Sequence, residues 1–264
     1  MKAKDIIEAM NKWAKPGLID SWDNTGFQIG NMDTKVNKIL VSLDLDNLAL
    51  ETAVNNNCNM IISHHPFIFK PLERILSTEP KGRQVMEIIK NEIVVYNAHS
   101  NLDLADGGVN DELARLLGLK DTRFLQERYK GEDGTIYGYG RIGKVEEILL
   151  KNFIEKIKEV LDISNLILYG DRNRKIKNIA VCGGSGSSFI YDAYKKGADL
   201  YITGDIKYHD AQLGYNLGLN IVDAGHYHTE KIILPRIKNY LNMKLEKKVE
   251  IEVLMKSDLP REIY

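Results

Sequence analysis

The sequence has no long apolar segment, which argues against a protein that crosses a membrane. No apolar run in the 264 residues approaches the roughly 20 residues needed to span a bilayer. Residues 1–17 show no apolar signal-peptide core; their apolar positions follow helical spacing and end at Pro16-Gly17. We therefore expect a cytoplasmic protein with no membrane partner.

Cysteine is also scarce. Cys58 and Cys182 lie far apart and form no CxxC pattern, which is typical of structural thiols in a reducing compartment. The sequence contains no GxSxG nucleophile motif, and no cysteine adjoins the histidine motifs described below.

The chain has no excess of either charge. Lys and Arg number 36 against 37 Asp and Glu, and the formal net charge is −1. This balance gives no support for DNA as a partner, although a local basic patch is compatible with it. A hydrophobic content of 44% is ordinary for a globular protein, and the length suffices for one large or two modest domains.

Apolar runs typical of buried strands alternate with helical patterns along the chain. This alternation predicts an α/β fold with a mainly parallel sheet. Past Leu125 the pattern changes to a glycine-rich stretch with hairpin character, and a helix is expected over 146–161. We place a domain boundary between Glu127 and Gly134, which predicts an N-terminal lobe over 1–128 and a C-terminal lobe over 129–264.

The second half of the sequence weakly repeats the first. At an offset of 140, Ile39–Ser63 aligns with Ile179–Thr203 without a gap; chance similarity is the alternative. At an offset of 127, Val94-Val95 aligns with Ile221-Val222, His99 with His226, and Asp103 with Glu230. Two related α/β lobes are the simplest explanation.

All six histidines follow predicted strands or begin the segment after one: His64, His65, His99, His209, His226 and His228. Ligands collect at the carboxyl ends of strands in α/β sheets. Two carboxylates accompany them, because Asp103 follows His99 by four residues and Glu230 follows His226 by four. In a helix this spacing puts both members of a pair on one face.

Imidazole and carboxylate ligands without thiolate suit Zn, Fe, Mn, Co or Ni. Five or more such ligands exceed what one tetrahedral zinc needs, whereas two ions with a bridging carboxylate would use them all. Simpler explanations exist for individual residues. His209 and His228 can be solvent-facing, His99 can be a hydrogen-bonding neighbour of the site, and Asp103 can cap a helix. The joint pattern favours the metal site.

Three further motifs leave their roles open. The glycine-rich stretch 182–188 suits either a phosphate-binding loop or a tight turn that allows close packing. Asp205 lies at the repeat position of His65, where a substrate-facing, ligand-supporting or structural role is possible. Asp23 and Asn24 in WDNTG can be turn-forming residues.

The motifs SHHP, NAHSNLD, CGGSGSSF, TGDIKYHD and GHYHTE, together with WDNTGFQIG and GYGRIG, resemble those of the NIF-three-like family. Its members are also called dinuclear metal-centre hexameric proteins or GTP cyclohydrolase I type 2 homologs. The resemblance runs from Trp22 to Glu230. It implies two related α/β lobes with a dinuclear metal site between them, a toroidal homohexamer, and no inserted middle domain in this chain.

By this resemblance the two divalent ions are bound by His64, His65, Asp103, His226 and Glu230, with Glu230 as the bridging carboxylate. One hypothesis is a metal-dependent hydrolase acting on a nucleotide-like small molecule, GTP by family naming, with His99 or His209 as catalytic proton carriers. The alternative is a non-enzymatic, metal-stabilised ring that binds a protein, small molecule or DNA.

Overall fold

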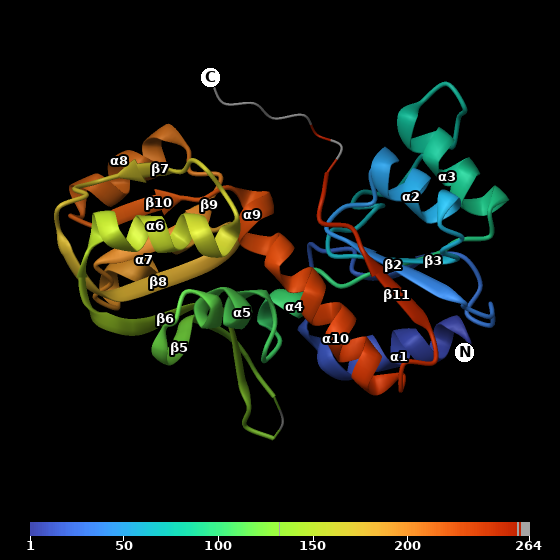
Figure 1. Ribbon diagram of the computed structural model, residues 1–264, viewed down its shortest axis with the longest axis horizontal. Coiled ribbons are helices and arrows are strands. Elements are labelled where there is room, and N and C mark those ends of the chain that lie inside the picture. The colour runs from blue at the N-terminus through green and yellow to red at the C-terminus, as the bar shows by residue number, and fades with distance from the viewer. Residues whose placement is uncertain (132, 258, 260–264) are drawn as a thin grey trace. The chain divides into compact units, whose positions relative to one another are not determined.

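The computed structural model describes residues 1–131, 133–257 and 259, and the chain divides into two compact units (Figure 1). Unit 1 comprises Met1–Leu102 and Leu234–Tyr264, and unit 2 comprises Asp103–Ile233. This division differs from the expected one, because residue 128 lies on a strand inside unit 2 and the C-terminal segment belongs to unit 1.

Unit 1 is built on a five-stranded sheet in the order β1-β4-β3-β2-β11, in which β1 is antiparallel to β4 and the other pairs are parallel. Its elements are α1 (Ala3–Trp13), η1 (Pro16–Leu18), β1 (Gly26–Ile29), β2 (Lys38–Ser42), α2 (Asn47–Asn55), β3 (Met60–Ser63), α3 (Pro80–Lys90), β4 (Val94–Asn97), α10 (Leu234–Lys244) and β11 (Glu250–Val253). Helix α4 (Ser100–Leu104) contains the boundary between the units.

The sequence of unit 1 explains its layers. Every residue of β3 and β4 is buried, as expected for parallel strands covered on both faces. Alternate residues such as Leu40, Ile61 and Val95 face a core shared with α2 and α3. The C-terminal segment returns to this unit because β11 pairs with β2 and α10 contacts both β2 and α1.

Unit 2 contains a six-stranded sheet in the order β5-β6-β8-β9-β10-β7. Its elements are α5 (Val109–Leu116), β5 (Lys120–Lys130), β6 (Ile136–Leu149), α6 (Leu150–Leu161), β7 (Ile167–Tyr169), β8 (Lys175–Ser185), η2 (Ser187–Phe189), α7 (Ile190–Lys195), β9 (Leu200–Gly204), α8 (Tyr208–Asn216), β10 (Asn220–Asp223), α9 (His226–Glu230) and η3 (Lys231–Ile233). One sheet face packs on α5 and α6 and the other on α7 and α8.

The helix expected over 146–161 begins later, at Leu150, because residues 146–149 complete β6. Ile148 and Leu149 pair with Ile176 and Lys175 of β8, so strand pairing takes precedence over the helical pattern of the sequence. No helix among the described residues has the length and apolar character needed to cross a membrane.

The internal repeat is confirmed by the two sheets. The order β1-β4-β3-β2 in unit 1 corresponds to β7-β10-β9-β8 in unit 2, with an antiparallel first pair in each. The register follows the offset of 140, because Ile39 pairs with Met60 and Ile179 pairs with Leu200. Each unit is therefore a version of the same β-α-β-α-β arrangement.

The last strand of the repeat shows a shift of one residue. Met60 pairs with Val94 and Leu200 pairs with Asn220, which corresponds to an offset of 126 in the strands. His99 and His226 keep the offset of 127. Unit 2 thus has one extra residue between its strand and the histidine that follows it.

Candidate metal centre

Three histidines of unit 1 converge after neighbouring parallel strands. His64 and His65 follow β3, and His99 follows β4. Each offers a ring nitrogen, and the three nitrogens lie within 4.8 Å of one another. His64 is fully buried, whereas His65 and His99 are partly exposed. The fold therefore gathers three imidazoles at the carboxyl ends of the strands, as the sequence predicts.

The Nδ1 atom of each of these rings is held by a defined partner. Nδ1 of His64 lies 2.8 Å from the carbonyl oxygen of Ala98, and Nδ1 of His65 lies 2.8 Å from Oδ1 of Asp44. Asp44 follows β2, so it too comes from the carboxyl end of a strand. Such partners fix the ring orientation and make Nε2 the nitrogen that would bind an ion.

His99 is oriented by Asp23, whose side chain is fully buried. Oδ1 of Asp23 lies 2.9 Å from Nδ1 of His99, and Oδ2 accepts hydrogen bonds from Ser100 and Thr25. Burial raises the pKa of Asp23, but the hydrogen bonds from His99, Ser100 and Thr25 outweigh it and hold the pKa well below its ordinary value. Asp23 is therefore ionised at neutral pH and acts as more than a turn-forming residue.

Unit 2 brings together the other three predicted ligands. Nε2 of His226 lies 3.1 Å from Oε2 of Glu230, and carboxylate oxygens of Asp103 and Glu230 lie within 4.8 Å of each other. Glu230 is 3% exposed. Two carboxylates so close, one of them buried, repel each other unless a cation or a shared proton compensates, so this donor set fits a divalent metal ion.

Nδ1 of His226 lies 2.7 Å from Oδ2 of Asp205. Asp205 follows β9 and occupies the repeat position of His65. It adopts a left-handed backbone conformation, with φ of 56°, that turns the chain after the strand. Asp205 thus supports a predicted ligand, which is one of the roles that its sequence position left open.

The Duf34/NIF3 (NGG1p interacting factor 3) family matches residues 1–260. The chain belongs to this family. The family resemblance inferred from the motifs is thereby confirmed, and the two-lobed α/β fold with it.

Relatives in the Duf34/NIF3 family cover nearly the whole chain. The GTP cyclohydrolase 1 type 2 homolog of Streptococcus pneumoniae is 34% identical over 96% of both chains. The homolog of the same name in Clostridium perfringens is 34% identical over 99% of both. A Bacillus cereus protein related to NIF3 has a TM-score of 0.94 at 27% identity, covering 100% of this chain and 99% of that one. Reduced HcgD from Methanocaldococcus jannaschii has a TM-score of 0.81 at 31% identity, covering 96% and 98%.

The glycine-rich stretch 182–188 makes room for Glu230. Gly184 has φ of +66°, and a Cβ atom there would clash with Oε1 of Glu230 and lie 3.2 Å from Nε2 of His226. A Cβ on Gly183 would lie 2.7 Å from Cγ1 of Val109. Residues 182–185 belong to β8, and a register shift against β9 lies between Val181 and Ser185. The geometry therefore corresponds to the close-packing alternative.

Asn110 and Thr229 support the same site, although their sequence motifs did not single them out. Asn110 is 1% exposed; its Nδ2 donates to the carbonyl oxygen of Asp103 at 3.0 Å, and its Oδ1 accepts from the N–H of Gly183 at 3.0 Å. Thr229 Oγ1 accepts from the N–H of Gly184 at 2.9 Å. Asn110 thereby ties the backbone of one predicted ligand to the strand that lies against another.

His209 lies apart from these groups. It is exposed on α8, and its Nδ1 lies 3.0 Å from Oε1 of Gln212. Within the described ranges it belongs to no cluster of three potential ligands. Its predicted catalytic role stays a prediction, and unit 2 by itself does not place it with His226 and Glu230.

A pocket of about 380 Å³ in unit 1 adjoins His65 and Asp44. Lys81 lines it, and its Nζ donates to the carbonyl oxygen of Phe67 at 3.1 Å while lying 3.7 Å from that ring's centroid. Burial lowers the pKa of Lys81. This ammonium group places a positive charge in the pocket beside the predicted ligand His65.

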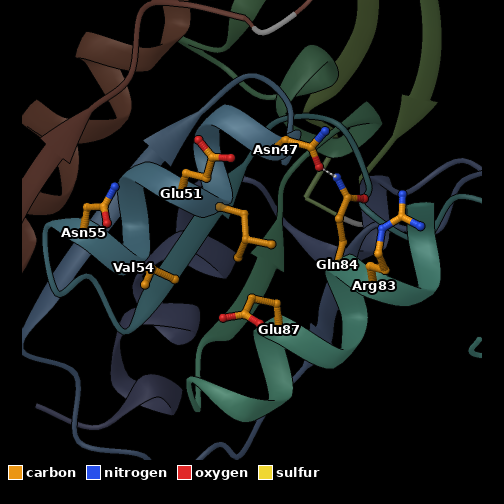
Figure 2. A pocket seen from close by; sticks show the side chains of 8 residues that line it. Asn47, Glu51, Val54, Asn55, Arg83, Gln84 and Glu87 are labelled. Carbon is orange, nitrogen blue, oxygen red and sulfur yellow. Dashed lines mark hydrogen bonds between the residues drawn. The ribbon is translucent and has the colours of Figure 1, made fainter. Parts of the chain in front are cut away.

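A second pocket of unit 1, about 330 Å³, lies between α2 and α3 (Figure 2). The side chains of Asn47 and Gln84 are joined across it by a hydrogen bond of 2.8 Å. Its described lining contains no histidine or cysteine, so it has no part in the candidate metal centre.

Both cysteines are buried and free, as expected for structural thiols. Burial raises the pKa of Cys58 to about 11. Burial, followed by the charges of Asp103 and Glu230, also raises the pKa of Cys182. Thiols with such pKa values are poor nucleophiles near neutral pH, so neither cysteine is suited to covalent catalysis.

Proposed function

We propose that the protein binds two divalent metal ions and hydrolyses a nucleotide-like small molecule with them. The proposed ligands are His64, His65, Asp103, His226 and Glu230. The observation that carries the proposal is that each unit already holds its potential metal-binding side chains in fixed positions, close to one another. In unit 1 the imidazoles are oriented through Nδ1, and in unit 2 a histidine and two carboxylates lie close enough together for a cation to stabilise them.

The two sets complement each other. His64 and His65 come from unit 1, whereas Asp103, His226 and Glu230 come from unit 2. Neither set alone satisfies two ions, and together they provide the mixed nitrogen and oxygen ligands that Zn, Fe, Mn, Co and Ni accept. We assign Glu230 as the bridging carboxylate, in keeping with its buried position beside both His226 and Asp103.

Ions bound by these residues would lower the pKa of a water molecule and polarise the bond under attack. His99, backed by the ionised Asp23, is suited to accept and return a proton at Nε2. Lys81 is suited to attract an anionic group of the substrate into the pocket beside His65. The names of the relatives make GTP the first compound to assay.

Metal content and turnover together test this function. We expect about two ions per chain in the wild-type protein and none in the His64→Ala/His226→Ala double variant. Glu230→Gln replaces a carboxylate that can bridge two ions with a neutral amide, so we expect turnover to fall at least about 100-fold. Elemental analysis measures the ions, and formate release from GTP measures turnover.

Reconstitution with iron, manganese and zinc in turn controls for metal lost during purification. A content near zero after reconstitution would contradict the metal centre itself. Two bound ions together with unchanged turnover in Glu230→Gln would contradict the hydrolytic role, and would favour a metal-stabilised binding protein.

We also propose that the protein assembles into a homohexamer. Unit 1 exposes one large apolar side chain beside His99 and four more in the segment that follows His65 in the sequence. Such exposed apolar residues suit an interface between copies of the chain: Trp22, Phe69, Leu72, Ile75 and Leu76. A solution mass equal to six chains, measured by light scattering, is the expected result. The Phe69→Asp/Ile75→Asp variant should have a smaller mass, and a monomeric wild-type protein would contradict the proposal.

A further inference from the structure

A pocket of about 500 Å³ in unit 2 gathers lysines from β5, β6, β8 and α6. None of its described lining residues is a predicted metal ligand. Its charged lining residues are Lys120, Lys144, Lys156 and Lys177, with Asp121 and Glu146. Four positive and two negative side chains leave an excess of two positive charges in a chain that has almost no net charge overall.

The strand register places like charges side by side. Lys120 on β5 pairs directly with Lys144 on β6, and Lys144 pairs with Asn178, the neighbour of Lys177 on β8. Like charges directly opposite each other destabilise a sheet. An anion bound among these ammonium groups would relieve the repulsion.

Both strand pairs are irregular at this pocket. The register of β5 and β6 shifts between Lys120 and Arg123, and that of β6 and β8 shifts between Lys144 and Ile148. Asp121, inside the first irregularity, has φ of 51°. Bulges redirect side chains and are frequent beside binding sites, so two consecutive ones are consistent with a constructed pocket.

The lysine on α6 is placed by a glycine. Gly118 has φ of +75°, and a Cβ atom there would lie 2.7 Å from Nζ of Lys156. Nζ of Lys156 also lies 5.6 Å from the ring centroid of Phe153, which lines the pocket. The absence of a side chain at position 118 therefore allows this ammonium group to reach the pocket.

Lysines next to the pocket form ion pairs with glutamates, whereas the four lysines of the pocket do not do so among the described residues. Lys158, on the same helix as Lys156, pairs with Glu155 at 3.2 Å, and Lys175, on the same strand as Lys177, pairs with Glu147 at 2.7 Å. Among the residues that the structure describes, none of the four pocket lysines forms an ion pair within 4.0 Å.

We propose that this pocket binds a small phosphate-bearing anion with at least two negative charges, such as a diphosphate. Lysine ammonium groups act as point charges toward phosphate oxygens, and the volume suits a small ligand rather than a polymer. The site is independent of the metal centre, because it uses other residues of unit 2.

Calorimetric titration of the full-length protein with inorganic pyrophosphate tests the site. We expect the Lys144→Gln/Lys177→Gln variant to bind at least about tenfold more weakly, because it removes two of the four cations. The Lys158→Gln and Lys175→Gln variants remove nearby lysines that already have partners, and they should bind as the wild type does. Added NaCl should weaken binding, because it screens the charges.

Three results would overturn the proposal. The first is no binding up to about 10 mM pyrophosphate, which would leave no meaningful affinity. The second is pyrophosphate binding by the Lys144→Gln/Lys177→Gln variant that equals wild-type binding, or loss of pyrophosphate binding in Glu230→Gln. In either case the anion would occupy another site, such as the metal centre. The third is lysine-dependent binding of a short DNA duplex without binding of pyrophosphate, which would identify a nucleic-acid backbone as the occupant.

Discussion

The Gly184→Ala variant is expected to fail to bind the two metal ions that we propose for this site. A methyl group at this position would clash with Oε1 of Glu230, whose side chain is buried and cannot swing into solvent without losing its place beside His226. The left-handed backbone at φ of +66° adds strain of about 1–2 kcal/mol. We expect metal content to fall from about two ions per chain toward zero, as measured by elemental analysis.

Gly197→Ala is the matched control. Gly197 has a similar φ of +74°, but a Cβ atom there would meet nothing within 4 Å. It should lose a similar amount of stability and keep its metal. Equal metal content in the two variants would mean that Glu230 can move aside, and that the contact with Gly184 does not position it.

The Arg141→Met variant is expected to lose about 1–3 kcal/mol of unfolding free energy, because it removes a buried guanidinium from an ion pair whose carboxylate is 29% exposed. Arg141 is 3% exposed on β6, and its guanidinium binds both carboxylate oxygens of Asp111 on α5. It also donates to the carbonyl oxygens of Gly138 and Gly140. Methionine retains much of the side-chain volume but leaves Asp111 and these carbonyls without their partner. Chemical denaturation measures the change.

Lys175→Met serves as the comparison for Arg141→Met. Lys175 also pairs with a residue of β6, Glu147, but the two side chains are 68% and 56% exposed. An exposed pair contributes about 1 kcal/mol or less, so this variant should unfold nearly as the wild type does. A loss of stability in Arg141→Met no larger than in Lys175→Met would show that the network does not hold α5 to the sheet.

The Arg141 network also bears on the metal centre. Asp111 is the neighbour of Asn110, which bonds to both Asp103 and Gly183. If α5 shifts when Arg141 is replaced, Asn110 shifts with it. Arg141 of the GYGRIG motif therefore supports α5, a role that the motif alone did not reveal.

The amino-acid sequence by itself determined the α/β class, the repeat and the family. Buried strands require apolar runs, and these runs recur at an offset of 140 that the strand register reproduces. Histidines placed directly after such runs must lie at the carboxyl ends of the strands, and the parallel pairing of β3 with β4 then brings His99 beside His64 and His65.

Only the tertiary structure decided which groups support the predicted ligands. Asp23 reaches His99 across 76 residues, and Asn110 reaches Gly183 across 73. Contacts of that range depend on how the helices and strands pack, and no local spacing encodes them. The return of α10 and β11 to unit 1, and the meeting of four lysines in one pocket of unit 2, have the same origin. Local patterns specify elements, whereas the packing of distant elements decides which side chains meet.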